Sequence, residues 1–294
     1  MTTQAQILRP AANTYRGEIT DPDRWSTWKP RQGDVIVCTP SKSGTTWTQS
    51  ILAMLLNGGP DLPDKVPVIS PWVDADLGVP ADEVEAALNA QPGRRVVKTH
   101  TPADGFPVWD GVTVIGVYRH PLDVFFSLRK HYANMKITPP DDPLVQPKSE
   151  ALNWWLNSGF VFDDCDKDNL ALLTRHYREA AARKDVLLMH YGAMAADGRA
   201  AVASLARAAE IDAGEDLIDR VAEATSFGAM KAKAEDFAPV GGTGFWRSDS
   251  AFFDSGGADK WRGLLTDREV ARYKSRLAEE ISESADRAWL ETGA

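Results

Sequence analysis

Residues 39–47 bring together a lysine, a glycine and several hydroxyl side chains, in the order Thr-Pro-Ser-Lys-Ser-Gly-Thr-Thr-Trp. The apolar, β-branched residues 34–38 before them predict a buried strand, and residues 48–56 after them predict a helix. Free N–H groups at a helix start carry partial positive charge and bind phosphate or other anions. The sequence therefore predicts an anion-binding loop. The residues that would give it charge, hydroxyl donors and close backbone approach are Lys42, Ser43, Gly44, Thr45 and Thr46.

The order of these residues differs from that of the common nucleotide-binding loop. That loop needs Gly-x-x-x-x-Gly-Lys-Ser/Thr, in which the lysine follows the second glycine, whereas Lys42 precedes the only glycine of this stretch. An ordinary strand-to-helix turn with a hydroxyl cap has a similar composition. From spacing alone, the stretch is compatible with either an anion-binding loop or a structural turn.

Three more short apolar runs, at residues 95–98, 112–117 and 185–189, predict strands that alternate with helices. This alternation is typical of an α/β domain with a central parallel sheet and helices on both faces. Ligands in such sheets bind beyond the carboxyl ends of the strands. We therefore expect the loops that follow the strands to meet at one edge. These loops are residues 39–46, 98–102 and 118–121.

Helices are predicted from apolar spacing and helix-favouring composition, and loops from glycine and proline content. The predicted helices are residues 48–56, 81–90, 151–157, 169–183, 198–209, 214–224 and 267–284, with another after Pro121. The predicted loops are residues 58–80, 135–149 and 232–262. No internal repeat or linker divides the chain, so we expect a single large domain.

Two of the expected loops carry residues that could do chemistry. His100 follows Lys98 and Thr99, and an imidazole with a pKa near 6.5 can act as a base at neutral pH. A lone histidine is, however, more often structural. Arg119 follows the strand at 112–117 and could hold a phosphate with two hydrogen bonds. Alternatively, it is a surface arginine at a strand-to-helix junction.

Residues 39–47 resemble the 5′-phosphosulfate loop of the cytosolic-type sulfotransferases, Pro-Lys-Ser-Gly-Thr-Thr-Trp, with Ser41 inserted before the lysine. Those enzymes use 3′-phosphoadenosine 5′-phosphosulfate (PAPS) as donor. The resemblance runs from about residue 34 to about residue 278. It implies one P-loop-like domain over residues 34–294, with residues 1–33 as an extension packed on it. Residues 69–73 and the Lys-Thr-His-Thr-Pro sequence at 98–102 are nearer to bacterial glycolipid-type members.

The resemblance implies in-line displacement at sulfur without a metal. His100 would take the proton of the acceptor hydroxyl, and 3′-phosphoadenosine 5′-phosphate (PAP) would leave. Lys42 would stabilise the charge that grows on the leaving phosphate oxygen, and Lys98 would hold the sulfuryl oxygens. The acceptor would be a small molecule or a lipid with a hydroxyl group, such as a phenol, an alcohol or a glycolipid.

Further blocks of the sequence resemble the family's donor-binding motifs. Arg119-x-Pro-x-Asp with Ser127 resembles its 3′-phosphate block, and residues 225–230, Thr-Ser-Phe-Gly-Ala-Met, resemble an adenine-side segment. Tyr191 stands where the family has Tyr-Glu-Asp-Met, although glycine and alanine replace the acidic pair. The donor-binding residues that the resemblance implies are Lys42, Ser43, Gly44, Thr45, Thr46, Trp47, Arg119, Ser127, Tyr191, Thr225, Ser226, Phe227, Met230, Phe253 and Gly256.

One segment departs from the family. Asp254 and Ser255 stand where Arg-Lys binds the 3′-phosphate, and a carboxylate about 4 Å from a phosphate costs up to about 4 kcal/mol at an effective dielectric constant near 20. The 3′-phosphate could be held instead by Arg247 or Lys260 after the loop moves, which we favour because the other 3′-phosphate residues remain. Otherwise donor binding is weak, or the donor lacks a 3′-phosphate. A nucleotide-binding protein with impaired donor binding and a P-loop-type kinase are the alternative functions.

Composition limits the partners. The 294 residues carry a formal net charge of −9, which is not typical of a nucleic-acid binder. Residues 1–10 lack a signal-peptide core, and the longest apolar run, residues 51–56, is shorter than the roughly 20 residues of a membrane span. Cys38 on a buried strand and one other cysteine favour a reducing, cytoplasmic setting. Arg262, Thr266, Asp267 and Ala271 occupy the places of the family's C-terminal dimer motif, Lys-x-x-x-Thr-Val-x-x-x-Glu, so the motif is only partly present.

Ten tryptophans indicate an aromatic-lined acceptor pocket. Core packing would account equally well for each of these aromatic residues. The candidates for the pocket are Trp72, Phe106, Trp109, Trp154 and Trp155.

Overall fold

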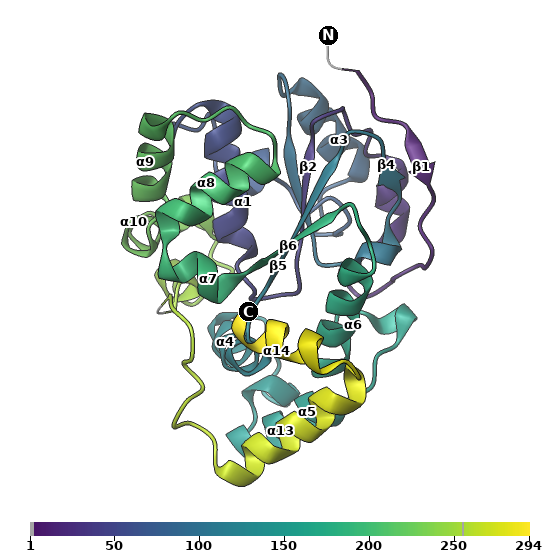
Figure 1. Ribbon diagram of the computed structural model, residues 1–294, viewed down its shortest axis with the longest axis vertical. Coiled ribbons are helices and arrows are strands. Elements are labelled where there is room, and N and C mark those ends of the chain that lie inside the picture. Colours follow the sequence, from purple (N-terminus) through teal and green to yellow (C-terminus); the bar gives the residue numbers. More distant parts are fainter. Residues whose placement is uncertain (1–2, 255) are drawn as a thin grey trace.

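A four-stranded parallel sheet forms the centre of the computed structural model, which describes residues 3–254 and 256–294 (Figure 1). Its strand order is β3-β2-β5-β6, and every neighbouring pair is parallel. The strands are β2 (Val35–Cys38), β3 (Val96–Thr99), β5 (Thr113–Tyr118) and β6 (Val186–His190). Each lies within one residue of its predicted position, so the α/β prediction is confirmed.

Helices cover both faces of this sheet because its strands are apolar on both sides. On one face Val35 and Val37 of β2 pack with α1 (Thr45–Asn57), α8 (Gly198–Ala208) and α9 (Glu215–Ala224) (Figure 1). On the other face Ile36 and Cys38 belong to a second core. The helices that contribute to this second core include α4 (Pro121–Asn134), α5 (Lys148–Asn157), α6 (Leu170–Ala181), α13 (Asp267–Glu280) and α14 (Ser284–Thr292).

Three predicted segments differ from the structure. The segment 58–80, predicted as a loop, contains the short helix α2 (Val66–Ile69). The helix predicted over 267–284 ends at Glu280, where Ile281 turns to an extended conformation and is buried in the core, and α14 begins at Ser284. The segment 232–262, predicted as a loop, contains α11 (Ala234–Phe237) and α12 (Asp249–Phe252). The remaining helices are α3 (Ala81–Ala90), α7 (Tyr191–Ala196) and α10 (Phe227–Ala232).

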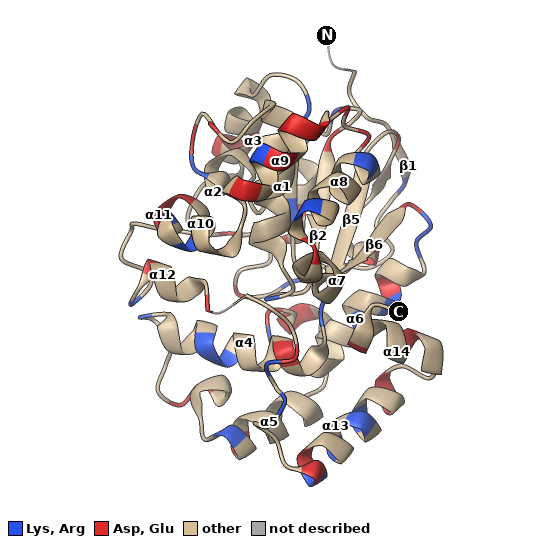
Figure 2. Ribbon diagram, turned by 60° about the vertical axis from the view of Figure 1, so that its left-hand side comes forward, with Lys and Arg blue, Asp and Glu red and all other residues tan. Residues whose placement is uncertain are grey.

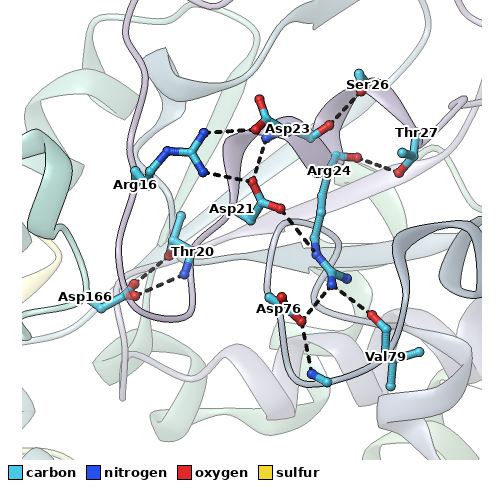
Figure 3. Close-up of polar contacts among 11 residues, drawn as sticks. Arg16, Thr20, Asp21, Asp23, Arg24, Ser26, Thr27, Asp76, Val79 and Asp166 are labelled. Atoms are coloured by element: carbon cyan, nitrogen blue, oxygen red, sulfur yellow. Dashed lines mark hydrogen bonds and ion pairs between the residues drawn. The ribbon is translucent and has the colours of Figure 1, made fainter.

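The N-terminal residues pack along the domain through both strand pairing and polar contacts. Strand β1 (Ile7–Arg9) pairs antiparallel with β4 (Val108–Trp109). Asp166 accepts hydrogen bonds from the main-chain N–H and the hydroxyl of Thr20, at 3.0 and 2.6 Å (Figure 3). Arg24, whose side chain is 7% exposed, pairs with Asp76 at 2.8 Å (Figure 3). These contacts bring Thr20 to the rim of the cavity described next.

Candidate functional site

A cavity of about 930 Å³ lies at the carboxyl ends of the parallel strands. It is lined by the loops after β2, β3, β5 and β6, as the parallel sheet requires. The catalytic and donor-binding residues that the resemblance implies all line this cavity, except Ser43, whose side chain is fully buried. Segments that lie far apart in the sequence therefore meet in one place.

The loop of residues 39–46 ends in a helix start whose N–H groups have no side-chain cap from Gly44. Gly44 has a φ of +108°, and a Cβ atom there would lie 2.8 Å from Cδ2 of Tyr191. The hydroxyl of Ser43 is buried and has no hydrogen-bond partner among the described residues. An unsatisfied buried hydroxyl destabilises by about 1–3 kcal/mol, so this side chain is a cost to the ligand-free loop, and the donors that an oxyanion would use are the main-chain N–H groups at the start of α1.

Lys42 is half-buried and lines the cavity, and its backbone φ of +62° is rare for a residue other than glycine. Its Nζ lies 3.2 Å from Nδ1 of His131 and 4.2 Å from the centre of the Phe252 ring. Burial, followed by the charges of Arg119 and Lys98, lowers the pKa of Lys42 to about 7. An anion bound beside Lys42 would favour its protonated form.

Lys98 enters the same cavity from the end of β3. Its Nζ lies 4.8 Å from the centre of the Trp72 ring, and burial lowers the pKa of this lysine to about 8. In the part of the chain that the structure describes, neither Lys42 nor Lys98 forms an ion pair with a carboxylate. Two positive groups are thus held in a desolvated place without a permanent counter-ion.

The imidazole of His100 is fixed in one tautomer. Its Nδ1 lies 2.7 Å from the carbonyl oxygen of Thr39, which can only accept, so Nδ1 carries the hydrogen and Nε2 is left as a proton acceptor. The ring also lies edge-on against Trp72, with 4.6 Å between ring centres. Burial, and next the charge of Lys98, lowers the pKa of His100 well below 6.5. The ring is therefore neutral at neutral pH.

Arg119 connects the loop after β2 with the C-terminal loop. Its guanidinium donates to the carbonyl groups of Lys42 and Gly257, at 3.3 and 3.2 Å, and lies 4.6 Å above the ring of Tyr191. Its Nε is buried, makes no hydrogen bond among the described residues, and is 3.8 Å from a carboxylate oxygen of Asp123. The Nε–H group of Arg119 is thus a donor that makes no hydrogen bond to another described residue.

Aromatic rings surround the far end of the cavity. Trp47 meets Tyr191 edge-on with 5.8 Å between ring centres, and its Nε1 is buried without a hydrogen-bond partner in the described ranges. Phe227, at the start of α10, is 39% exposed and faces the C-terminal loop, since a Cβ atom on Gly256 would lie 2.9 Å from its ring. The other predicted residues here that line the cavity are Thr225, Ser226, Met230 and Phe253.

Asp168 and His131 are titratable residues of the cavity that the sequence did not point to. Asp168 accepts a hydrogen bond from the hydroxyl of Tyr132 at 3.3 Å, and burial raises the pKa of its carboxyl to about 6. Burial, followed by the charge of Lys42, lowers the pKa of His131 well below 6.5. Neither residue belongs to a motif. The only signals were the acidic stretch at 163–168 and the position of His131 one turn beyond Ser127 on the same helix.

Several aromatic and basic candidates lie elsewhere. Phe106 and Trp109 stack on each other and pack with Trp25 in the core, and Trp154 packs against the same core, so none of these residues lines the cavity. Aromatic composition alone does not separate core from pocket. The candidates that do line the cavity are Trp72 and Trp155.

The proposed substitutes for the family's Arg-Lys pair differ in position. Lys260 lines the cavity, whereas Arg247 lies outside it and donates from Nε to the carbonyl of Ala133 at 3.1 Å. Asp254 also lines the cavity, and Ser255 lies outside the described residues. Over residues 3–254 and 256–294, no cluster of three or more His, Cys, Asp or Glu could hold a metal ion. Within the same ranges, the helices are too short or too polar to cross a membrane.

The chain is similar in sequence to known sulfotransferases over most of its length. The sulfotransferase domain family profile matches residues 32–286. A glycolipid sulfotransferase of Mycobacterium bovis is 34% identical over 90% of this chain and 89% of its own length. Sulfotransferase 1B1 of Canis lupus familiaris is 25% identical over 86% of this chain and 84% of its own.

The fold is also similar to those of solved structures. The complex of mouse sulfotransferase SULT7A1 with PAP has a TM-score of 0.68 at 18% identity, covering 92% of both chains. A retinol dehydratase in complex with retinol and PAP has a TM-score of 0.67 at 18% identity, covering 89% of this chain and 84% of the other. At this level of identity, the similarity concerns the fold alone.

Proposed function

Because this chain belongs to the sulfotransferase domain family, as its motifs predicted, we propose that it moves a sulfuryl group from PAPS to a hydroxyl group of an apolar acceptor. The observation that carries this proposal is the state of His100. Its imidazole is neutral, its Nδ1–H is fixed on the Thr39 carbonyl, and its Nε2 stays available as a base beside two lysines. The PAP bound by two structurally similar proteins supports the choice of donor.

The residues present fit a nucleotide with phosphate groups at both ends. The uncapped start of α1, the main-chain N–H of Ser43 and the ammonium of Lys42 would hold the phosphosulfate. Arg119 and Ser127 would hold the 3′-phosphate. The other residues that we propose to contact the donor are Gly44, Thr45, Thr46, Trp47, Tyr191, Thr225, Ser226, Phe227, Met230, Phe253 and Gly256.

PAPS supplies a sulfuryl group on a phosphate leaving group. His100 would take the proton of the acceptor hydroxyl at Nε2, Lys98 would hold the sulfuryl oxygens, and Lys42 would stabilise negative charge on the departing phosphate oxygen. Fixed charges in a dry cavity act strongly because little solvent screens them. The same burial that lowers the pKa values of the two lysines makes their interaction with an anion stronger.

Part of the cavity lining suits an acceptor with a large apolar part. Val66, Leu128, Trp246 and Phe252 line the cavity, as does Asp168, whose carboxyl pKa is raised by burial. The name of the 34% identical mycobacterial relative supports a glycolipid among the possible acceptors, and phenols or simple alcohols would also meet the chemical requirement. An acceptor of this kind would be buried by apolar contacts and oriented by one polar group.

Replacing His100 by alanine tests the proposed mechanism most directly. With labelled PAPS and a panel of hydroxyl acceptors, we expect His100→Ala to lose about 100- to 10,000-fold in turnover, which is the usual effect of removing a general base. Calorimetric titration should show that PAP still binds, because the base lies at the reacting end. Undiminished turnover would remove His100 from the mechanism, and turnover of ATP without PAPS would indicate a P-loop-type kinase instead.

A further inference from the structure

The carboxylate of Asp254 lies between two ammonium groups at one edge of the cavity. Lys130 Nζ is 2.7 Å from Oδ1, and Lys260 Nζ is 3.5 Å from Oδ2. A third lysine, Lys231, donates to the main-chain carbonyl of the same residue at 3.2 Å. From the sequence, Asp254 is expected to repel a phosphate, but in the structure this residue is surrounded by lysines from α4, α10 and the C-terminal loop.

This cluster adjoins the proposed 3′-phosphate residues. Asp254, Gly257 and Lys260 line the same cavity as Arg119 and Ser127, and Arg119 donates to the carbonyl of Gly257. Lys130 and Ser127 both belong to α4. Helix α4 lies beside α12 (Figure 2), and Asp254 follows shortly after the end of α12. Burial, and next the charge of Arg119, lowers the pKa of Lys260, which places these two cations within electrostatic reach of each other.

The ion pairs around Asp254 are of a kind that exchanges readily. The Lys130 side chain is 59% exposed, whereas those of Asp254 and Lys260 are 26% and 23% exposed, and an ion pair with an exposed partner, such as that of Lys130, contributes little to stability. A phosphate carries more charge than a carboxylate and offers three acceptor oxygens. It would therefore compete well for the same ammonium groups. Gly257, with a φ of +80° and no atom close to its Cβ position, gives the loop room to change conformation.

We propose that Lys130 and Lys260 receive the 3′-phosphate of the donor, and that the Asp254 carboxylate occupies this anion position until the nucleotide displaces it. The inference rests on the proposed function, because it takes PAPS as the donor. Asp254 then acts as an internal competitor that lowers affinity only for nucleotides with a 3′-phosphate. The lysines replace the basic pair that the family supplies from the C-terminal loop itself.

Calorimetric titration with PAP and with adenosine 5′-monophosphate, its 3′-dephospho form, tests this exchange. Asp254→Asn should tighten PAP binding about twofold to fivefold, as loss of an exposed ion pair allows. The affinity for adenosine 5′-monophosphate should stay unchanged. Lys130→Met and Lys260→Met should each weaken the binding of PAP about tenfold and leave the affinity for adenosine 5′-monophosphate unchanged. Lys130 is exposed, so its replacement leaves the fold intact.

Asp259→Asn is the matched control. It removes the same charge from the same loop, but Asp259 pairs with Arg262 at 3.1 Å and not with the lysine pair, so the ratio of PAP to monophosphate affinity should stay at the wild-type value. The inference is overturned if Asp254→Asn behaves like Asp259→Asn, or if Lys130→Met leaves the ratio unchanged. Wild-type protein that binds neither nucleotide would instead overturn the proposed donor, and the inference with it.

Discussion

The two ends of the nucleotide side of the cavity hold positive charge in different ways. Around Lys42 and Lys98 the cations are buried, and among the described residues no carboxylate pairs with them. Around Lys130 and Lys260 the cations are more exposed and share the carboxylate of Asp254. Buried charges without partners are costly, whereas exposed pairs are nearly neutral in energy.

This difference suggests a division of tasks. The end that would hold the 5′-phosphosulfate is built before the ligand arrives, with fixed dipoles and an oriented base, which is what charge stabilisation during reaction requires. The end that would hold the 3′-phosphate selects the nucleotide through exchange of one anion for another. Variants that affect only one end therefore test whether the two ends differ in this way.

The largest structural effect is expected for Gly44→Ala. The left-handed backbone disfavours alanine by about 1–2 kcal/mol, and the new Cβ would lie 2.8 Å from the Tyr191 ring, which Arg119 and Trp47 hold in place. Overpacking of this kind adds about 1–3 kcal/mol. We expect a loss of about 2–5 kcal/mol in the free energy of urea unfolding, together with loss of PAP binding.

Gly257→Ala is the counterpart at the other end. Its φ of +80° carries a similar backbone penalty, but no atom lies within 4 Å of the Cβ position. It should therefore cost only about 1–2 kcal/mol in unfolding and leave binding of adenosine 5′-monophosphate intact. Equal losses for the two variants would show that the loop around Gly44 is not the more rigidly packed of the two.

A second difference concerns pH. The pKa of Lys42 in the ligand-free protein is about 7, so this lysine is losing its proton just above neutrality, whereas a bound phosphate would keep it protonated. Nucleotide binding should then take up a proton, and affinity should fall by up to about tenfold per pH unit above pH 7. The affinities for PAP and for adenosine 5′-monophosphate should fall in parallel as the pH rises, because both nucleotides carry the 5′-phosphate.

Calorimetry in two buffers with different ionisation enthalpies measures that proton uptake. Lys42→Met is the control, since it removes the group that titrates and should abolish the uptake along with part of the affinity. Affinity that stays constant between pH 7 and 9, or binding that releases protons, would contradict a desolvated Lys42 beside the 5′-phosphate.

The sequence predicted the sheet and most of the cavity lining because both depend on local signals. Apolar runs mark β2, β3, β5 and β6, and the motif residues follow directly after them. What the sequence did not predict depends on tertiary contacts. Lys130 and Asp254 are 124 positions apart, so nothing local indicates that a lysine neutralises the carboxylate.

Aromatic residues show the same limit. Trp72 and Phe106 both follow proline-containing or turn-forming sequence, yet Trp72 meets His100 in the cavity and Phe106 packs with Trp25 in the core. The end of α13 depends on Ile281, which leaves the helix because its side chain is buried in the core. In each case the three-dimensional packing decides between two environments that are equally compatible with the residue type.

The smallest expected effects belong to two serines, one at each end. Ser43→Ala removes a buried hydroxyl that has no hydrogen-bond partner in the described structure, so the ligand-free protein should be unchanged or up to about 1 kcal/mol more stable. Because the Ser43 side chain does not line the cavity, the same change should leave the affinities for PAP and adenosine 5′-monophosphate within about twofold of the wild-type values. Ser127→Ala, at a residue that does line the cavity, should weaken the binding of PAP by about twofold to tenfold and leave that of adenosine 5′-monophosphate unchanged. The 3′ assignment of Ser127 would be contradicted if Ser127→Ala weakened the binding of both nucleotides equally.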